Sequence, residues 1–166
     1  MKEKLPRDLE MFDLWERPGF LIRRLHQIQV AMFLENCEDF NVTPVQFGVL
    51  TTLYDQDVLH QSSIAAQLGV DRVTTADVIR RLERRGLLTR PPSVNDKRAK
   101  LARLTPEGRA LVDAVHPAMV DAQHRLVEPL TPSEQRRLME LMRKLVEAND
   151  TESRAPMLSG VRSAED

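Results

Sequence analysis

The sequence predicts a mainly α-helical fold with one short β-hairpin, and three observations support this prediction. Helix starts made of a hydroxyl cap followed by proline occur at Thr43-Pro44, Thr105-Pro106 and Thr131-Pro132. Proline is tolerated there because the amide that it lacks would have no partner in the first turn. Apolar residues between these starts recur every three to four positions, as in amphipathic helices. Two short strand-like runs also flank a turn-rich segment at 91–98.

The predicted elements follow the order helix, helix, short helix, turn, helix, hairpin, helix and helix. The residues from Asn149 onward are polar and lack apolar periodicity, so we expect a disordered tail at 149–166. The expected helices span 20–38, 44 to about 53, 64–68, 72–85, 106–127 and 132–148, and the expected hairpin strands span 87–90 and 100–104.

The middle of the chain has the pattern of a helix-turn-helix unit. Ser62 and Ser63 are expected to cap a short helix that ends at Gly69, a residue suited to a left-handed exit. Asp71 is expected to cap the next helix, which the hairpin follows directly, so the unit is winged. The apolar residues of that second helix expected to face the core are Val73, Val78, Ile79 and Leu82.

The composition excludes several classes of protein. A single cysteine, Cys37, rules out an intramolecular disulfide framework and a multi-cysteine zinc site. No apolar run approaches the roughly 20 residues that cross a bilayer, and the N-terminus lacks an apolar signal region, so we expect a cytoplasmic protein. The histidines lack metal-binding spacing and the glycines form no phosphate-binding loop, so we expect no enzyme activity, no metal and no cofactor.

The charges are distributed unevenly along the chain. Residues 72–103 hold ten Lys or Arg against three acidic residues, a net charge of +7 within a chain whose formal net charge is −1. A basic segment in an otherwise acidic protein indicates a polyanion-binding site. All seven aromatic residues precede position 55, so this segment has no rings on which unpaired bases could stack. The pattern therefore favours duplex DNA over single strands.

Four segments carry a resemblance to a known family. They are Leu68-Gly69-Val70, the run from Val78 to Leu88, Asn95-Asp96-Lys97-Arg98-Ala99-Lys100 at the hairpin tip, and Leu104-Thr105-Pro106-Glu107-Gly108. In these segments the chain resembles the MarR family of bacterial transcriptional regulators, and the resemblance extends from about Arg17 to Ala148. The pair Asp96 and Arg98 is the most characteristic feature of that family.

The resemblance implies one MarR-type domain over 1–166 that acts as a homodimer. The helices within 17–40 and 106–148 would interlock into an intertwined dimerisation base, and 43–104 would form the winged helix-turn-helix. Two recognition helices related by a two-fold axis would then read successive major grooves of a pseudo-palindromic operator.

The resemblance and the chemistry of the side chains together suggest the DNA contacts. The N-terminal residues of helix 72–85 would meet base edges, later arginines would meet phosphates, and the wing arginine, held by its aspartate, would enter the minor groove. Hydroxyls and free amides at the start of the preceding helix would bind a phosphate. The candidates are Ser62, Ser63, Arg72, Thr74, Thr75, Asp77, Arg80, Arg81, Asp96, Lys97, Arg98 and Lys100.

The first long helix resembles a subset of the family linked to aromatic-acid or aromatic acyl-CoA catabolism. An arginine beside aromatic rings suits an anionic aromatic ligand, because the guanidinium binds a carboxylate and the rings cover the ligand's faces. The chain is therefore expected to be a repressor released by a small aromatic carboxylate or acyl-CoA-like effector. The candidate ligand-binding residues are Trp15, Phe20, Arg23, His26, Phe40 and Phe47.

Alternatives remain open at this stage. The aromatic residues could belong to the core, with Arg23 and Arg24 forming dimer salt bridges. The protein could instead be a redox-responsive regulator acting through Cys37, although a cysteine near the C-terminal end of the first helix is more typical of an inert core residue. A ligand-independent architectural DNA-binding protein is a further alternative.

Overall fold

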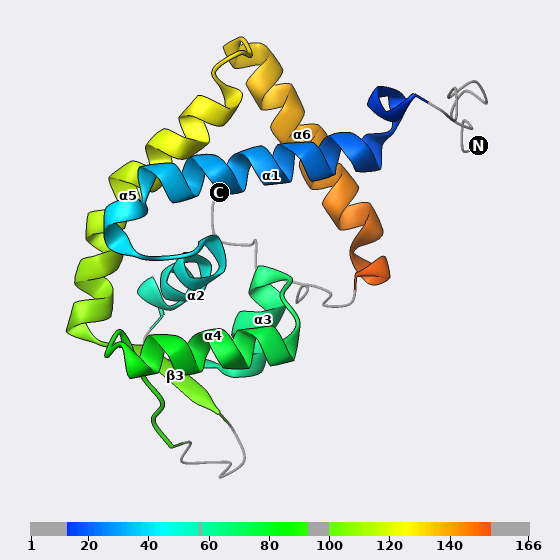
Figure 1. Ribbon diagram of the computed structural model, residues 1–166. Helices are drawn as coiled ribbons and strands as arrows, with labels where there is room; N and C mark the ends of the chain where they lie inside the picture. Colours follow the sequence, from blue (N-terminus) through cyan, green and yellow to red (C-terminus); the bar gives the residue numbers. More distant parts are fainter. Residues whose placement is uncertain (1–12, 57, 93–99, 154–166) are drawn as a thin grey trace.

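The computed structural model describes residues 13–56, 58–92 and 100–153, and helices dominate it (Figure 1). No helix in this described part is long and apolar enough to cross a membrane. The α-helices are α1 (Pro18–Asn36), α2 (Pro44–Tyr54), α3 (Gln61–Leu68), α4 (Arg72–Arg84), α5 (Pro106–Val127) and α6 (Pro132–Asn149). The strands are β1 (Leu59–His60), β2 (Leu88–Thr89) and β3 (Leu101–Leu104), and the short 3-10 helices are η1 (Leu14–Glu16), η2 (Glu38–Phe40) and η3 (Asp150–Glu152).

The capped helix starts are confirmed. The Thr43 hydroxyl accepts a hydrogen bond from the Gln46 amide at 3.2 Å, while the Gln46 side chain accepts one from the Thr43 amide at 3.2 Å. Thr131 and Glu134 form the same reciprocal arrangement at the start of α6. Each arrangement satisfies two amides that the helix itself leaves without partners.

The start of α3 differs from the prediction. The helix begins at Gln61, so Ser62 and Ser63 lie in its first turn and do not cap it. The reason is β1, a strand that the sequence did not predict and that leads directly into α3. The Gln61 amide donates to the carbonyl of Lys100 at 2.8 Å, so backbone from the sheet satisfies a group that a side-chain cap would otherwise satisfy.

The predicted hairpin forms two of the three strands of an antiparallel sheet with the order β1-β3-β2. Leu59 pairs with Ala102, and Leu88 pairs with Leu104. Strands β2 and β3 follow α4, and β1 precedes α3, so the winged helix-turn-helix is confirmed. Gly69 and Gly86 end the two helices with φ values of 62° and 71°, in the left-handed region predicted for Gly69.

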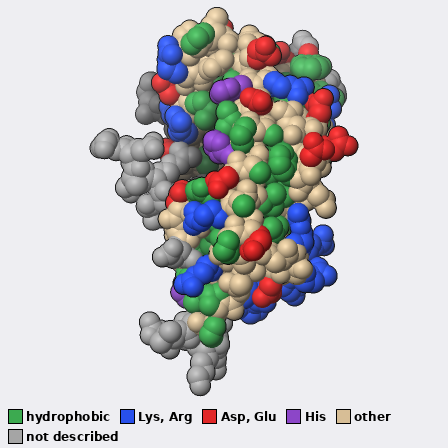
Figure 2. All heavy atoms as spheres, turned by 90° about the vertical axis from the view of Figure 1, so that its left-hand side faces the viewer, with side chains coloured by type: hydrophobic (Ala, Val, Ile, Leu, Met, Phe, Trp, Pro, Cys, Tyr) green, Lys and Arg blue, Asp and Glu red, His purple; other side chains and the backbone are tan. Residues whose placement is uncertain are grey.

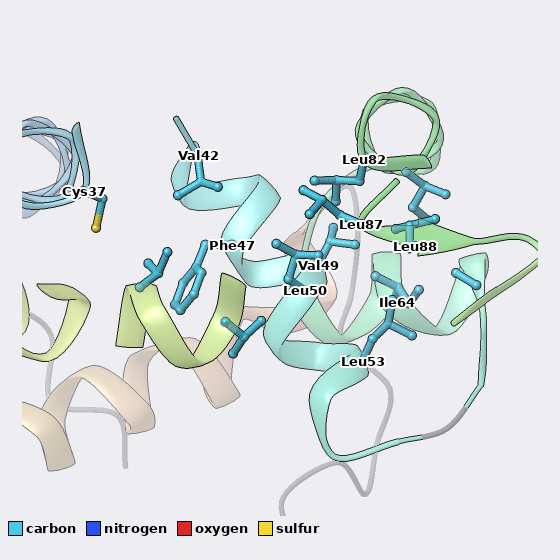
Figure 3. Close-up of a cluster of buried hydrophobic side chains, with 14 of the residues drawn as sticks. Cys37, Val42, Phe47, Val49, Leu50, Leu53, Ile64, Leu82, Leu87 and Leu88 are labelled. Carbon is cyan, nitrogen blue, oxygen red and sulfur yellow. The ribbon is translucent and has the colours of Figure 1, made fainter. Parts of the chain in front are cut away.

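The core of the winged unit lies around α2. Val49, Leu50 and Leu53 of α2 are completely buried, and they pack with Ile64 of α3 and Leu82 of α4 (Figure 3). Three helices and the sheet therefore share one apolar cluster, which fixes the position of α4 relative to the rest of the unit.

A pair of long helices, α1 and α5, continues from this unit and packs side by side (Figure 1). The Asn36 side-chain amide donates to the carbonyl of Ala118 at 3.2 Å, and Arg125 donates to the Asn36 side-chain oxygen at 2.7 Å. Pro117 lies inside α5, which changes direction along its length in Figure 1, as expected for a helix with an interior proline.

The last helix, α6, contributes no buried side chain among the described residues. All of its large apolar side chains except Leu138 are exposed, as are several on α1. The prediction of disorder from residue 149 is wrong for the first residues of that segment, because Asn149 ends α6 and η3 follows it. Residues 154–166 lie outside the described residues. The exposed apolar side chains are Leu21, Ile22, Leu25, Ile28 and Leu34 on α1, and Met139, Leu141, Met142, Leu145 and Val146 on α6.

Candidate nucleic-acid interface and ligand pocket

Helix α4 has one buried face and one exposed basic face. Thr75, Ile79 and Leu82 are buried, and they recur at the spacing of a single helical stripe. The opposite face is outward, and its basic side chains include Arg80 and Arg84. Figure 2 shows Lys and Arg side chains gathered towards the lower end of one side of the molecule. The buried stripe anchors the helix and leaves the basic face free to meet a polyanion.

Two residues near the start of α4 exchange the positions that the sequence analysis expected. Thr75, expected to meet base edges, is 0% exposed, and its hydroxyl donates to the Asp71 carbonyl at 2.9 Å. Val73, expected to face the core, is 78% exposed. The two residues are two positions apart and therefore lie about 200° apart around the helix, so burial of one exposes the other. The Thr75 side chain is therefore not available to contact DNA.

The Asp71 carboxylate is the N-cap of α4. One of its oxygens accepts the Val73 amide at 3.0 Å and the Thr74 amide at 2.9 Å, and the other accepts the Thr74 hydroxyl at 2.6 Å. These hydrogen bonds, the one from the Thr74 hydroxyl first, hold the pKa of Asp71 below its usual value. The hydroxyl hydrogen of Thr74 is therefore already used within the protein.

Other predicted contacts on α4 lie on its exposed surface. Asp77 pairs with Arg81 at 2.7 Å and with Arg80 at 3.5 Å, and all three side chains remain partly or largely exposed. Arg72 is exposed in the first turn. Surface ion pairs of this kind contribute little to stability. They align the arginine side chains along the helix, where phosphates of a docked duplex could replace Asp77 as their partner.

The remaining DNA-contact candidates lie at the start of α3 and around the wing. Ser62 is exposed and Ser63 partly exposed in the first turn of α3, where amides without helical partners favour an anion. Lys100 is exposed directly before β3, where it forms an antiparallel bridge with Pro92. The structure brings these residues to the end of the molecule that carries α4 (Figure 1). Asp96, Lys97 and Arg98 lie outside the described residues.

A pocket of about 690 Å³ lies between α1, α2 and α5, where the helix pair meets the winged unit. Its apolar lining includes Phe33, Phe47 and Met119, and its polar lining includes Tyr54 and His116. A concave apolar site with a few polar groups is typical of small-molecule binding. A volume of this size accommodates a small aromatic molecule.

One wall of the pocket carries a polar cluster. The Tyr54 hydroxyl donates to an Asp113 carboxylate oxygen at 2.5 Å, and the Arg109 guanidinium lies 4.5 Å from the centre of the Tyr54 ring. The hydrogen bond to Asp113 is the main reason why the pKa of Tyr54 is raised. The cluster joins α2 to the N-terminal half of α5.

Of the predicted ligand-binding residues, only Phe47 lines this pocket. Trp15, Phe20 and Arg23 form a separate cluster at the start of α1, in which the two rings are 5.8 Å apart and Arg23 lies 5.5 Å from the Phe20 ring centre. His26 is exposed on α1, and Phe40 of η2 packs against the core. The six candidates are thus not brought together within one chain.

Sequence reasoning missed Tyr54, Asp113 and His116 as pocket residues. A signal was present on α5, where Asp113 and His116 directly follow the buried residues Val112 and Val115. The sequence alone does not show which residues of α1 and α2 face α5 across the pocket.

Cys37 is 1% exposed and packs in the core at the end of α1 (Figure 3). Burial raises the pKa of its thiol. Because oxidants attack the thiolate, this environment does not favour a redox role. In the part of the chain that the structure describes, no cluster of His, Cys, Asp or Glu is arranged to hold a metal ion.

Comparison with known proteins identifies similar sequences and structures. The model of the MarR family matches residues 42–100. The chain is 28% identical over 145 residues to the HTH-type transcriptional repressor NicR of Pseudomonas putida, covering 87% of this chain and 92% of NicR.

Two solved structures extend the comparison to the fold. One is BpsR of Bordetella bronchiseptica, described in a study of how 6-hydroxynicotinic acid regulates its DNA binding; it has a TM-score of 0.78 and 33% identity, covering 82% of this chain and 97% of BpsR. The other is the transcriptional repressor CouR bound to a 23-mer DNA duplex, with a TM-score of 0.76 and 28% identity, covering 87% of this chain and 99% of CouR.

Proposed function

The chain belongs to the MarR family of DNA-binding transcriptional regulators, and we propose that it is a homodimeric repressor which leaves a pseudo-palindromic operator when a small aromatic acid binds. The observation that carries this proposal is the position of the pocket. It lies where the α1–α5 pair meets the winged unit, so a bound ligand would contact both parts at once. Members of this family are regulators and not enzymes, and we place this one in the cytoplasm.

The exposed apolar faces of α1 and α6 support the homodimer. Five large apolar side chains on each helix are exposed in one chain, and α6 buries nothing among the described residues. Large apolar side chains that are exposed together on one helix are typical of an interface with another protein. In our proposal the segments 17–40 and 106–148 of two chains cover each other, and 43–104 remains as the DNA-reading unit of a single domain.

The DNA contacts follow from the exposed face of α4. We propose that α4 enters the major groove, with Arg72, Thr74 and Asp77 near base edges and Arg80 and Arg81 at phosphates. Ser62 and Ser63 would bind a phosphate through the start of α3. As expected from the family resemblance, the wing would contact DNA through Asp96, Lys97, Arg98 and Lys100.

The pocket lining supports an aromatic effector. Phe33, Phe47 and Met119 can cover the faces of a ring, while His116 and Tyr54 can bind its polar substituents. BpsR, whose DNA binding is regulated by 6-hydroxynicotinic acid, is similar over most of this chain. The ligand would favour a tilt of the winged units that no longer matches successive major grooves.

The candidates on and near α1 have a role in this proposal only within the dimer. Trp15, Phe20, Arg23 and His26 lie outside the pocket of their own chain, and none of the described residues lining that pocket is Lys or Arg. We propose that α1 of the second protomer supplies them, with Arg23 as the carboxylate's partner. Phe40 would support the pocket from the core side.

The test is fluorescence anisotropy with the duplex upstream of the protein's own gene, titrated at two salt concentrations. Hydroxybenzoates, hydroxycinnamates, their CoA thioesters and hydroxynicotinates are then added in turn. We expect salt-dependent binding that one ligand class abolishes. His116→Gln should lose the ligand response and keep DNA binding, whereas the matched control His124→Gln, on the same helix outside the pocket, should keep both. DNA binding that none of these ligands changes would refute the proposal of an aromatic effector.

A further inference from the structure

Val73 is the most exposed large hydrophobic side chain in the described part of the protein, at 78%. The other exposed large hydrophobic side chains lie on η1, α1 and α6, and the proposed dimer would cover many of them. Val73 is the exception, because it stands exposed in the first turn of α4, between the exposed residues Arg72 and Thr74.

Folding does not explain this valine either. A β-branched side chain restricts its own rotamers in a helix, so valine is a poorer helix former than alanine, lysine or arginine at an exposed position. The contact that fixes this position is the hydrogen bond from the Val73 backbone amide to Asp71, which any residue except proline would make. The isopropyl group is therefore unnecessary for the stability of α4.

The polar neighbours of Val73 are already paired within the protein. The Thr74 hydroxyl donates to Asp71, the Thr75 hydroxyl is buried, and Asp77 is paired with Arg81. The first turn of α4 exposes Arg72, Val73 and Thr74, and of these three side chains only Val73 is apolar. In a recognition helix this is the turn whose side chains meet base edges.

An isopropyl group recognises one feature of the major groove. Thymine alone among the four bases carries a C5-methyl group, and apolar side chains discriminate it by contact. We propose that Val73 reads a thymine methyl in each half-site of the operator. This inference rests on the proposed function, because it requires α4 to enter the major groove.

The experiment starts from duplexes selected by the full-length protein from a random-sequence pool. Each thymine of the selected site is then replaced by deoxyuridine, which keeps base pairing and removes only the methyl group. For the wild type we expect one thymine in each half-site at which this replacement weakens binding about fourfold, the effect of one methyl group left unburied. Replacing both symmetric thymines should weaken binding by about the square of that factor.

Two variants assign the effect to Val73. Val73→Ala should bind the thymine duplex about as weakly as the wild type binds the deoxyuridine duplex, and it should no longer distinguish the two. Val73→Thr, which keeps one methyl group, should retain part of the discrimination. Because the side chain is exposed and valine and threonine are weaker helix formers than alanine, Val73→Thr should unfold at about the wild-type temperature and Val73→Ala at the same or a slightly higher one.

The outcomes separate this inference from the proposed function. Specific binding without any deoxyuridine effect, or an effect that persists unchanged in Val73→Ala, would overturn the role of Val73 and leave the regulator intact. A selected half-site that contains no thymine would also overturn the role of Val73 and leave the proposed regulator intact. Failure of the wild type to select any sequence would overturn both.

Discussion

The Arg85 guanidinium donates a hydrogen bond of 2.8 Å to the backbone carbonyl of Asn41. Arg85 is the C-cap of α4, and Asn41, in the left-handed conformation with φ 49°, forms the turn between η2 and α2. Pro44, three residues further on, lines the pocket. This one bond therefore joins the end of the DNA-facing helix to the segment that borders the pocket.

We expect Arg85→Met to uncouple DNA binding from the effector. Methionine keeps the apolar length of the side chain and removes its donors, so movement of the 41–44 turn would no longer reach α4 through this bond. The ratio of DNA affinities without and with ligand should fall by about threefold or more. Anisotropy titrations with the operator duplex measure this ratio.

Arg84→Met is the matched control for that prediction. Arg84 is exposed at the same end of α4, so its substitution removes the same charge close to the same place. Both variants should reduce the salt dependence of DNA binding, but only Arg85→Met should change the affinity ratio. An equal change in both variants would show that charge, and not the bond to Asn41, is responsible.

Substitutions of Thr75 should affect stability and not sequence preference, whereas substitutions of Val73 should affect sequence preference and not lower stability. Its hydroxyl donates to the Asp71 carbonyl, but that carbonyl also accepts the Thr75 amide at 3.0 Å and keeps a partner when the hydroxyl is lost. Thr75→Val should therefore change the free energy of unfolding by less than about 1 kcal/mol, while Thr75→Ala, which leaves a small void, should lower it by about 1–2 kcal/mol.

Chemical denaturation measures these changes. Neither Thr75 variant should alter which sequence is selected from a random duplex pool, because the side chain is buried. A changed sequence preference in Thr75→Val would contradict the burial of this residue and restore it as a base contact.

The contrast between Val73 and Thr75 shows what sequence patterns can predict here. The caps at Thr43 and Thr131 and the left-handed glycine at position 69 depend on a few consecutive residues, and all three were predicted correctly. Polarity alone predicted which side of α4 faces the core, and it placed the Val73 side chain inside and the Thr75 side chain outside. The structure reverses both, because the phase of the helix is set by Ile79 and Leu82 packing into the core.

The pocket was beyond sequence prediction for a different reason. Its walls come from α1, α2 and α5, so its lining depends on how distant segments pack. The aromatic residues near the start of α1 are close in sequence to one another but lie away from Phe47 in one chain. Strand β1 was missed because two residues are too few to establish an alternating pattern.

Substitution of Leu145 on α6 tests the proposed dimer interface. The side chain is exposed in one chain together with the other apolar residues of that helix. In the proposed dimer Leu145→Glu would bury a charge, so we expect a monomer by light scattering and loss of cooperative operator binding. Lys144→Glu, one position earlier on the polar side of α6, should remain dimeric. Dimerisation of both variants would show that α6 is not the interface.

Tyr54 is the single tyrosine of the chain, so its titration can be followed directly by the ultraviolet absorbance of the phenolate. Its hydrogen bond to Asp113 stabilises the neutral phenol, and the nearby carboxylate disfavours the phenolate, so the pKa lies above the ordinary value of 10.0. Because the folded pKa is raised, the stabilisation is complete below the unfolded pKa and is lost as the pH rises through the folded pKa.

We expect Asp113→Asn to lower the titration midpoint of Tyr54 towards that of an exposed tyrosine. Asp121→Asn removes a carboxylate from the same helix outside the pocket and should leave the midpoint unchanged. A ligand that binds beside Tyr54 should also shift the wild-type midpoint, since it would change the surroundings of the phenol. An identical midpoint in the wild type and Asp113→Asn would contradict the Tyr54–Asp113 hydrogen bond, and with it the polar wall of the pocket.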